Sequence, residues 1–147
     1  MSKAEEYLTP EEEQEVVNAI GMAEKNTSGE IRVHIEKHTS LDPYSRAKEV
    51  FHLLKMDETQ QKNGVLIYIA IENRAFAICG DKGINDVVPK DFWDTTRDIM
   101  TSHFKNLDLK QGLVAGILKA GEELKKHFPY QSDNVNELTN EISKGTL

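Results

Sequence analysis

Cysteine is almost absent from this sequence, since its 147 residues include only Cys79. A lone cysteine cannot form a disulfide within the chain and offers no cysteine-based metal site. Cys79 lies in an apolar segment, so we expect a buried, inert thiol rather than a nucleophile.

Long apolar runs are absent as well. No segment approaches the ~20 apolar residues that cross a bilayer. The N-terminal residues 1–7 lack the apolar region of a secretory signal. We therefore expect a cytoplasmic protein with no membrane segment.

Positive charge is in short supply. Lys and Arg number 18 against 25 Asp and Glu, which leaves a formal net charge of −7. This balance argues against nucleic acid or an acidic membrane surface as a partner. The excess of carboxylates is compatible with cation binding, although most acidic side chains of a globular protein lie on solvated helix faces.

Several catalytic signatures are missing. The sequence has no Walker loop, no Gly-x-Gly-x-x-Gly, no His-Glu-x-x-His and no Gly-x-Ser-x-Gly motif. The enzyme classes that these motifs identify most directly are therefore excluded.

What the sequence does contain is one unbroken apolar run, from Val65 to Ile71. Its length and its β-branched residues predict a strand buried on both faces. A short polar turn follows at residues 72–74, and the apolar character resumes from Ala75 to Cys79. Because a parallel return would need a much longer connection, the two strands must form an antiparallel hairpin.

Helical and alternating patterns surround this hairpin. Capping signals and apolar spacing predict helices over about 10–25, 43–54, 89–105 and 108–128, and alternation predicts a strand over 31–36. The first strand, the second helix and the run from Val65 form a β-α-β unit, so those two strands should be parallel. We expect an α/β fold: a three-layer α/β/α sandwich whose small mixed sheet combines this unit with the hairpin. One domain should span residues 8–130, and a C-terminal tail, 131–147, should pack on it or fray from it.

The strand directions place several oxygen-bearing side chains at one end of the sheet. Glu30 and Asn63 should enter the sheet where Asp81 leaves it, and Asp86 lies five residues further along. Carboxylate, amide and carbonyl oxygens are the ligands that Ca²⁺ and Mg²⁺ prefer, so these four residues form a candidate metal site. The alternative is that Asp81 and Asn85 satisfy backbone groups in a turn while Glu30 is solvated.

The opposite end of the sheet carries a second polar group. Asp42, Glu72 and Arg74 could meet near the hairpin turn, where a structural ion pair would explain them. His34 is expected to occupy the polar face of the first strand.

An ordered series of motifs resembles the TPM domain family, which includes thylakoid, photosystem-II-associated and receptor-modulating members. The motifs are Ser28-Gly29-Glu30-Ile31-Arg32-Val33, Asn63-Gly64-Val65-Leu66-Ile67-Tyr68, Asn73-Arg74 with Gly80-Asp81-Lys82-Gly83-Ile84, Phe92-Trp93, Gly112-Leu113, and His127-Phe128-Pro129 with Asn136-Glu137-Leu138. The resemblance implies an α/β/α sandwich. It also implies a divalent-cation site or an activity like that of acid phosphatases, because members with each property exist. Many relatives carry a signal peptide or a membrane segment, so we expect this chain to be a free-standing version.

These observations lead to three hypotheses about function. The first is a soluble TPM domain that binds a divalent cation, Ca²⁺ or else Mg²⁺, near Asp81. The second is a weak, metal-assisted acid phosphatase whose nucleophile no residue type reveals. The third is an assembly or chaperone-like module with an unknown protein partner.

Overall fold

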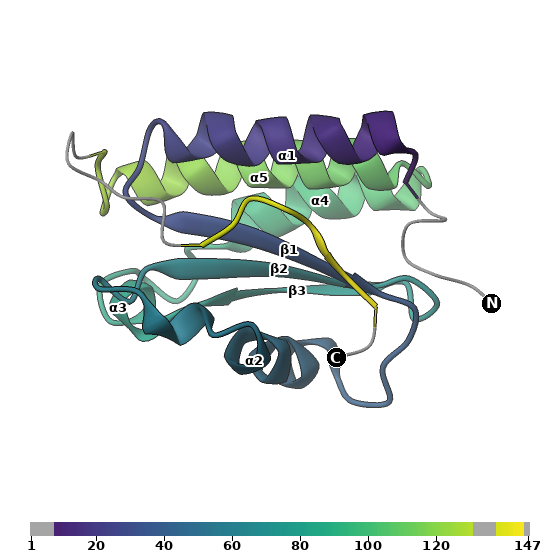
Figure 1. Ribbon diagram of the computed structural model, residues 1–147, viewed down its shortest axis with the longest axis horizontal. Coiled ribbons are helices and arrows are strands. Elements are labelled where there is room, and N and C mark those ends of the chain that lie inside the picture. Colours follow the sequence, from purple (N-terminus) through teal and green to yellow (C-terminus); the bar gives the residue numbers. More distant parts are fainter. Residues whose placement is uncertain (1–7, 131–137, 146–147) are drawn as a thin grey trace.

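Helices cover both faces of a central sheet, as Figure 1 shows. The computed structural model describes residues 8–130 and 138–145. Within these ranges its elements are α1 (Pro10–Glu24), β1 (Glu30–Glu36), α2 (Pro43–Leu53), the 3₁₀ helix η2 (Met56–Glu58), β2 (Gly64–Ala70), β3 (Ala75–Gly80), α3 (Lys82–Asn85), α4 (Asp94–Lys105), α5 (Leu109–Lys125) and β4 (Ser143–Lys144). Helices α1, α4 and α5 form one outer layer and α2 lies on the other side of the sheet. The expected three-layer sandwich is confirmed.

The sheet is mixed, with strand order β3-β2-β1-β4. Strands β1 and β2 are parallel, with Glu30 opposite Gly64. Strands β2 and β3 form the antiparallel hairpin, with Val65 opposite Gly80. Both strand directions predicted from the sequence are confirmed, so the start of β1, the start of β2 and the end of β3 share one end of the sheet.

Local signals account for where the main helices begin. The Thr9 side chain and Glu12 form a reciprocal capping box, and Pro10 occupies the first turn of α1. At the start of α2, the Asp42 side chain accepts a hydrogen bond from the amide of Ser45. Asp108 caps α5 in the same way through the amide of Gln111.

Three features differ from the sequence-based expectation. The segment after β3 forms the short helix α3 rather than a plain connection. Helix α4 begins at Asp94 rather than near Pro89, because residues 90–93 form turns before it. Part of the C-terminal tail joins the sheet as β4, where Ser143 and Lys144 pair with β1. Residues 131–137 lie outside the described ranges, and the boundary between domain and tail stays a prediction.

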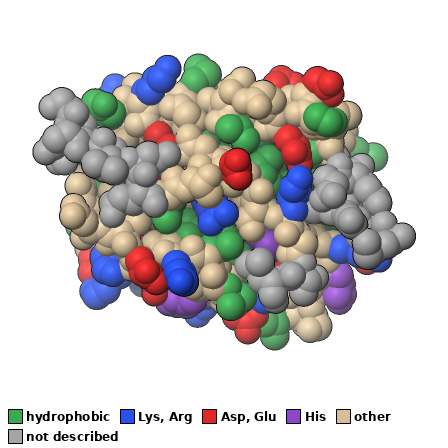
Figure 2. Space-filling model, in the orientation of Figure 1, with side chains coloured by type: hydrophobic (Ala, Val, Ile, Leu, Met, Phe, Trp, Pro, Cys, Tyr) green, Lys and Arg blue, Asp and Glu red, His purple; other side chains and the backbone are tan. Residues whose placement is uncertain are grey.

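Two apolar cores lie on opposite faces of the sheet. Ile31, Val33 and Ile35 of β1 face the larger core, which contains residues of α1, α4 and α5. The smaller core lies under α2 and includes Leu66 and Tyr68 of β2. Every residue of β2 is buried, as the sequence predicted for this strand. On the face drawn in Figure 2, acidic and basic side chains are interspersed. None of the described helices has the length and apolar character needed to cross a membrane.

Helices α1 and α5 approach each other so closely that one position of their contact, Gly121, has no room for a side chain. A Cβ atom added to Gly121 of α5 would lie 2.7 Å from the Cβ atom of Ala23 and 3.1 Å from its Cα atom. Backbone and methyl atoms cannot rotate away, so the helices would have to separate. Gly21 of α1 is different, because its added Cβ would meet only the Asn140 side chain, at 3.9 Å.

We predict opposite effects of alanine at these two helix positions. Gly121→Ala should lower the free energy of unfolding by ~1–3 kcal/mol through overpacking. Gly21→Ala should raise it by ~0.5–1 kcal/mol, because alanine loses less backbone entropy in a helix. Urea denaturation of both variants measures the difference, and equal effects at the two sites would contradict the close packing of α1 on α5.

Candidate functional site

Asp81 lies where β3 ends and α3 begins. Its Oδ1 atom accepts a hydrogen bond of 2.7 Å from the amide of Lys82 and so caps α3. Its Oδ2 atom is buried and has no hydrogen-bond partner among the described residues. A buried carboxylate oxygen without a donor is costly. Capping alone, the structural alternative stated above, therefore does not account for the whole side chain.

Backbone carbonyls from the loop before β2 lie against the start of α3. A Cβ atom at Gly83 would come within 2.3 Å of the carbonyl oxygen of Gln61 and 2.5 Å of that of Lys62. Only glycine permits this approach, which brings two hard oxygen atoms to the helix that Asp81 caps. Lys62 itself adopts a left-handed backbone conformation, with φ 52°.

The other predicted ligands have different partners. The Asp86 carboxylate is exposed and forms an ion pair of 2.6 Å with Lys82. The Asn63 side chain donates a hydrogen bond of 2.9 Å to the carbonyl of Ser28. Glu30 is buried, and its Oε1 atom accepts a hydrogen bond of 2.6 Å from the amide of Leu138.

Glu30, Asn63 and Asp81 therefore share one end of the sheet, as predicted, but the carboxylates do not converge. Within residues 8–130 and 138–145, no group of three or more His, Cys, Asp and Glu is placed to hold a metal ion. The four-residue metal site stays a prediction, and Asp81 is its best-supported member.

The carboxylate of Glu24 lies near Glu30, and the sequence did not single it out. Burial raises the pKa of Glu24 to about 7, and the negative charge of Glu30 adds to the effect. Its Oε2 atom accepts a hydrogen bond of 3.1 Å from the amide of Ile31, which opposes the rise. Because Glu24 ends α1 while Glu30 begins β1, only the fold brings them together.

A buried polar network lies on the face of β1 that α2 partly covers. Arg46 of α2 donates two hydrogen bonds to the Glu36 carboxylate, at 2.9 and 3.1 Å, and Tyr68 donates a third. Burial alone would raise the pKa of Glu36, but the hydrogen bonds from Arg46 and Tyr68 outweigh it and hold that pKa below its usual range. The network ties α2 to the sheet.

His34 extends this network to the C-terminal strand. It is fully buried, its Nδ1 atom lies 2.8 Å from the Ser143 hydroxyl of β4, and its Nε2 atom lies 3.4 Å from Glu36. Burial lowers the pKa of His34 despite the nearby carboxylate. The sequence placed His34 on the polar face of the strand. The alternation of Arg32, His34 and Glu36 was the available signal, but it could not identify Arg46 or Ser143 as partners.

Two smaller expectations have clear outcomes. Cys79 is a buried free thiol, and burial raises its pKa to about 11, with a further contribution from Asp81. The suggested meeting of Asp42, Glu72 and Arg74 is wrong. Asp42 caps α2, Glu72 lies 3.7 Å from Lys37, and Arg74 has no ion-pair partner among the described residues.

Comparison with known proteins shows which family the chain belongs to. The family model of the TPM domain matches residues 1–123. The chain belongs to the TPM domain family. This TPM chain is also similar to the BA42 protein from the psychrophilic bacterium Bizionia argentinensis, solved by NMR. The two are 59% identical with a TM-score of 0.91, over 99% of this chain and 100% of that one.

Two more distant structures share the fold alone. One is the N-terminal domain of a protein from P. gingivalis, with 16% identity and a TM-score of 0.68, covering 84% of this chain and 82% of that chain. The other is the N-terminal domain of the cg2496 protein from Corynebacterium glutamicum, with 12% identity and a TM-score of 0.64, covering 87% of this chain and 80% of that chain. A comparison with curated proteins gave no match.

We predict that Arg46→Ala lowers the free energy of unfolding by ~3–5 kcal/mol, because it leaves the buried Glu36 carboxylate without its cation. Arg97→Ala is the matched control. It removes an exposed ion pair with Asp94, so it should cost ~0–1 kcal/mol. Chemical denaturation at neutral pH compares the two, and a small loss for both would show that the network is not needed for stability.

A second prediction concerns pH. The pKa of Glu24 is raised on folding, from 4.5 to about 7. The contribution of Glu24 to the free energy of unfolding is therefore fully present below pH 4.5. It decreases as the pH rises towards 7 and is lost above that pH. Glu24→Gln should match the wild type near pH 4.5 and be more stable at pH 8 by up to ~3 kcal/mol. Glu58→Gln makes the same substitution at an exposed position and is the matched control. Denaturation curves across this range check it, and a constant difference for Glu24→Gln would contradict the shifted pKa.

Proposed function

We propose that this TPM domain binds a divalent cation, Ca²⁺ or Mg²⁺, at the junction of β3 and α3. The observation that carries the proposal is the buried Oδ2 atom of Asp81, which has no hydrogen-bond partner among the described residues. A cation would supply the missing positive charge. The carbonyls of Gln61 and Lys62, which lie against Gly83 at the start of α3, are oxygen donors of the kind that both ions accept.

The present hydrogen-bond and ion-pair partners of the other candidate ligands indicate which of them could turn towards a cation most easily. Asp86 forms an exposed ion pair with Lys82, and such a pair contributes only ~0–1 kcal/mol. Turning Asp86 towards a cation would therefore cost little. Glu30 is buried and bonded to the amide of Leu138, so recruiting its carboxylate would break a buried hydrogen bond. Asp81 and Asp86 are the expected carboxylate ligands, and Glu30 the least accessible of the predicted set.

The proposal predicts that Ca²⁺ or Mg²⁺ raises the melting temperature of the protein by binding at Asp81. At a cation concentration a hundredfold above Kd, the midpoint should rise by about 5–10 °C, because the ion binds the folded chain alone. Asp81→Asn should abolish this rise. Asparagine caps helices as well as aspartate does, so the variant should still fold. Thermal melting and calorimetric titration measure both effects.

Asp42→Asn provides the matched control, because Asp42 is also a helix N-cap but lies at the start of α2. It should retain the full response to the cation. The proposal fails if the wild type gives no heat and an unchanged melting curve with both ions, or if Asp81→Asn responds as strongly as the wild type.

The same variants test the phosphatase hypothesis. A metal-assisted phosphatase would use the cation to polarise a phosphoryl oxygen. Cation-dependent hydrolysis of p-nitrophenyl phosphate that Asp81→Asn abolishes and Asp42→Asn retains would extend the proposal from binding to catalysis.

A further inference from the structure

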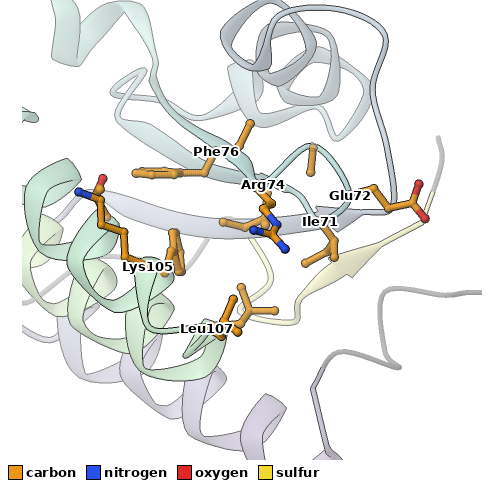
Figure 3. A pocket seen from close by; sticks show the side chains of 12 residues that line it. Ile71, Glu72, Arg74, Phe76, Lys105 and Leu107 are labelled. Atoms are coloured by element: carbon orange, nitrogen blue, oxygen red, sulfur yellow. The ribbon is translucent and has the colours of Figure 1, made fainter.

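A groove lies at the other end of the hairpin from Asp81. It has a volume of about 900 Å³ and runs between the β2–β3 turn and the connection from α4 to α5. Figure 3 shows it from close by, with Arg74 and Phe76 on the hairpin side and Lys105 and Leu107 on the helical side. Its volume falls within the ~300–1,000 Å³ of typical small-ligand sites.

Aromatic and aliphatic side chains make up much of the groove. Phe76 of β3 and Phe104 of α4 meet edge to face, with ring centroids 5.1 Å apart. Both rings and the nearby Leu109 are only partly buried, so apolar surface remains open within the groove. A ligand with an apolar body could cover this surface.

Two cations border this apolar surface in a chain whose net charge is −7. Arg74 and Lys105 are exposed, and neither forms an ion pair with any residue that the structure describes. The lining contains one carboxylate, Glu72, which is paired with Lys37. Figure 3 shows the Glu72 carboxylate directed away from Arg74. The charge of the groove is therefore complementary to an anion.

The two rims share an unusual backbone feature. Arg74 has φ 50° and Leu107 has φ 58°, a left-handed conformation that glycine or asparagine adopts more readily. The Leu107 side chain is also 83% exposed. Neither stability nor local conformation favours leucine there, and contact with an apolar ligand would give its side chain a role.

We propose that this groove binds an acyl carboxylate, with the head group at Arg74, the positive charge of Lys105 on the opposite side, and the hydrocarbon chain over Phe76, Phe104 and Leu107. The planar guanidinium of Arg74 can hold a carboxylate through two charge-assisted hydrogen bonds, and Lys105 adds positive charge on the helical side of the groove. A hydrocarbon chain needs no hydrogen bonds from apolar walls. A peptide would bury its amide groups against those walls without partners, which is unfavourable. The chemistry of the lining thus favours an acyl chain over a peptide.

The test uses decanoate, below the concentration at which it forms micelles, titrated into the full chain. Two-dimensional NMR should show saturable shifts around Phe76 and Phe104. The double variant Arg74→Asn, Lys105→Gln should weaken binding at least tenfold. Asparagine suits the left-handed conformation at residue 74, so loss of folding does not confound the result.

Matched controls separate the head group from the chain. Lys55→Asn removes a lysine that is also exposed and left-handed, with φ 58°, but lies outside the groove, so it should leave the Kd unchanged. Decanol, which has the same chain without the charge, should bind the wild type at least tenfold more weakly than decanoate and be insensitive to the double variant. Leu107→Asn should weaken both ligands while raising the melting temperature.

Three outcomes would overturn the proposal. They are no saturable shifts with decanoate, equal decanoate affinity in the wild type and the double variant, or binding of an acidic, leucine-rich peptide where decanoate does not bind. Asp81→Asn should bind decanoate with the affinity of the wild type, because the groove lies at the other end of the hairpin.

Discussion

The complete burial of β2 is the constraint on which the rest of this structure depends. All seven of its residues are buried, so the strand needs a hydrogen-bonded neighbour on each edge and an apolar layer on each face. Strands β1 and β3 supply the edges, while α2 on one side and α1, α4 and α5 on the other supply the layers. The α/β/α sandwich is the arrangement that satisfies all four requirements at once.

The same constraint determines where polar chemistry can occur. Burying a charged group in the sheet is costly unless the group is paired, as Glu36 is with Arg46 and Tyr68. Removing one partner from such a network leaves a buried charge, whereas the exposed pairs of Lys82 and Arg97 are replaceable. The two groups of functional interest that lack a partner among the described residues lie at opposite ends of the hairpin, the Asp81 Oδ2 atom at one end and Arg74 at the other.

Sequence reasoning succeeded where the signal was local. The capping box at Thr9, the short hairpin connection and the alternation in β1 each depend on residues a few positions apart, and they were enough for the layers and the strand directions. It failed where the partner was distant. Ser143, for example, reaches His34 across 109 positions of the sequence. The groove was missed for the same reason, because Phe76 and Phe104 meet only once α4 has packed.

The separation between the two ends of the hairpin has a consequence for how they act. Strand β3 spans Ala75 to Gly80, a length of roughly 20 Å at ~3.4 Å per residue, between the groove and Asp81. Sites that far apart, with no shared partner, contribute independently to stability. Coupling would require an element with two alternative arrangements, and strands packed on both faces do not slide by one residue without exposing their apolar side chains. A cation at Asp81 and an acyl chain at Phe76 should therefore bind additively, with neither ligand changing the affinity for the other.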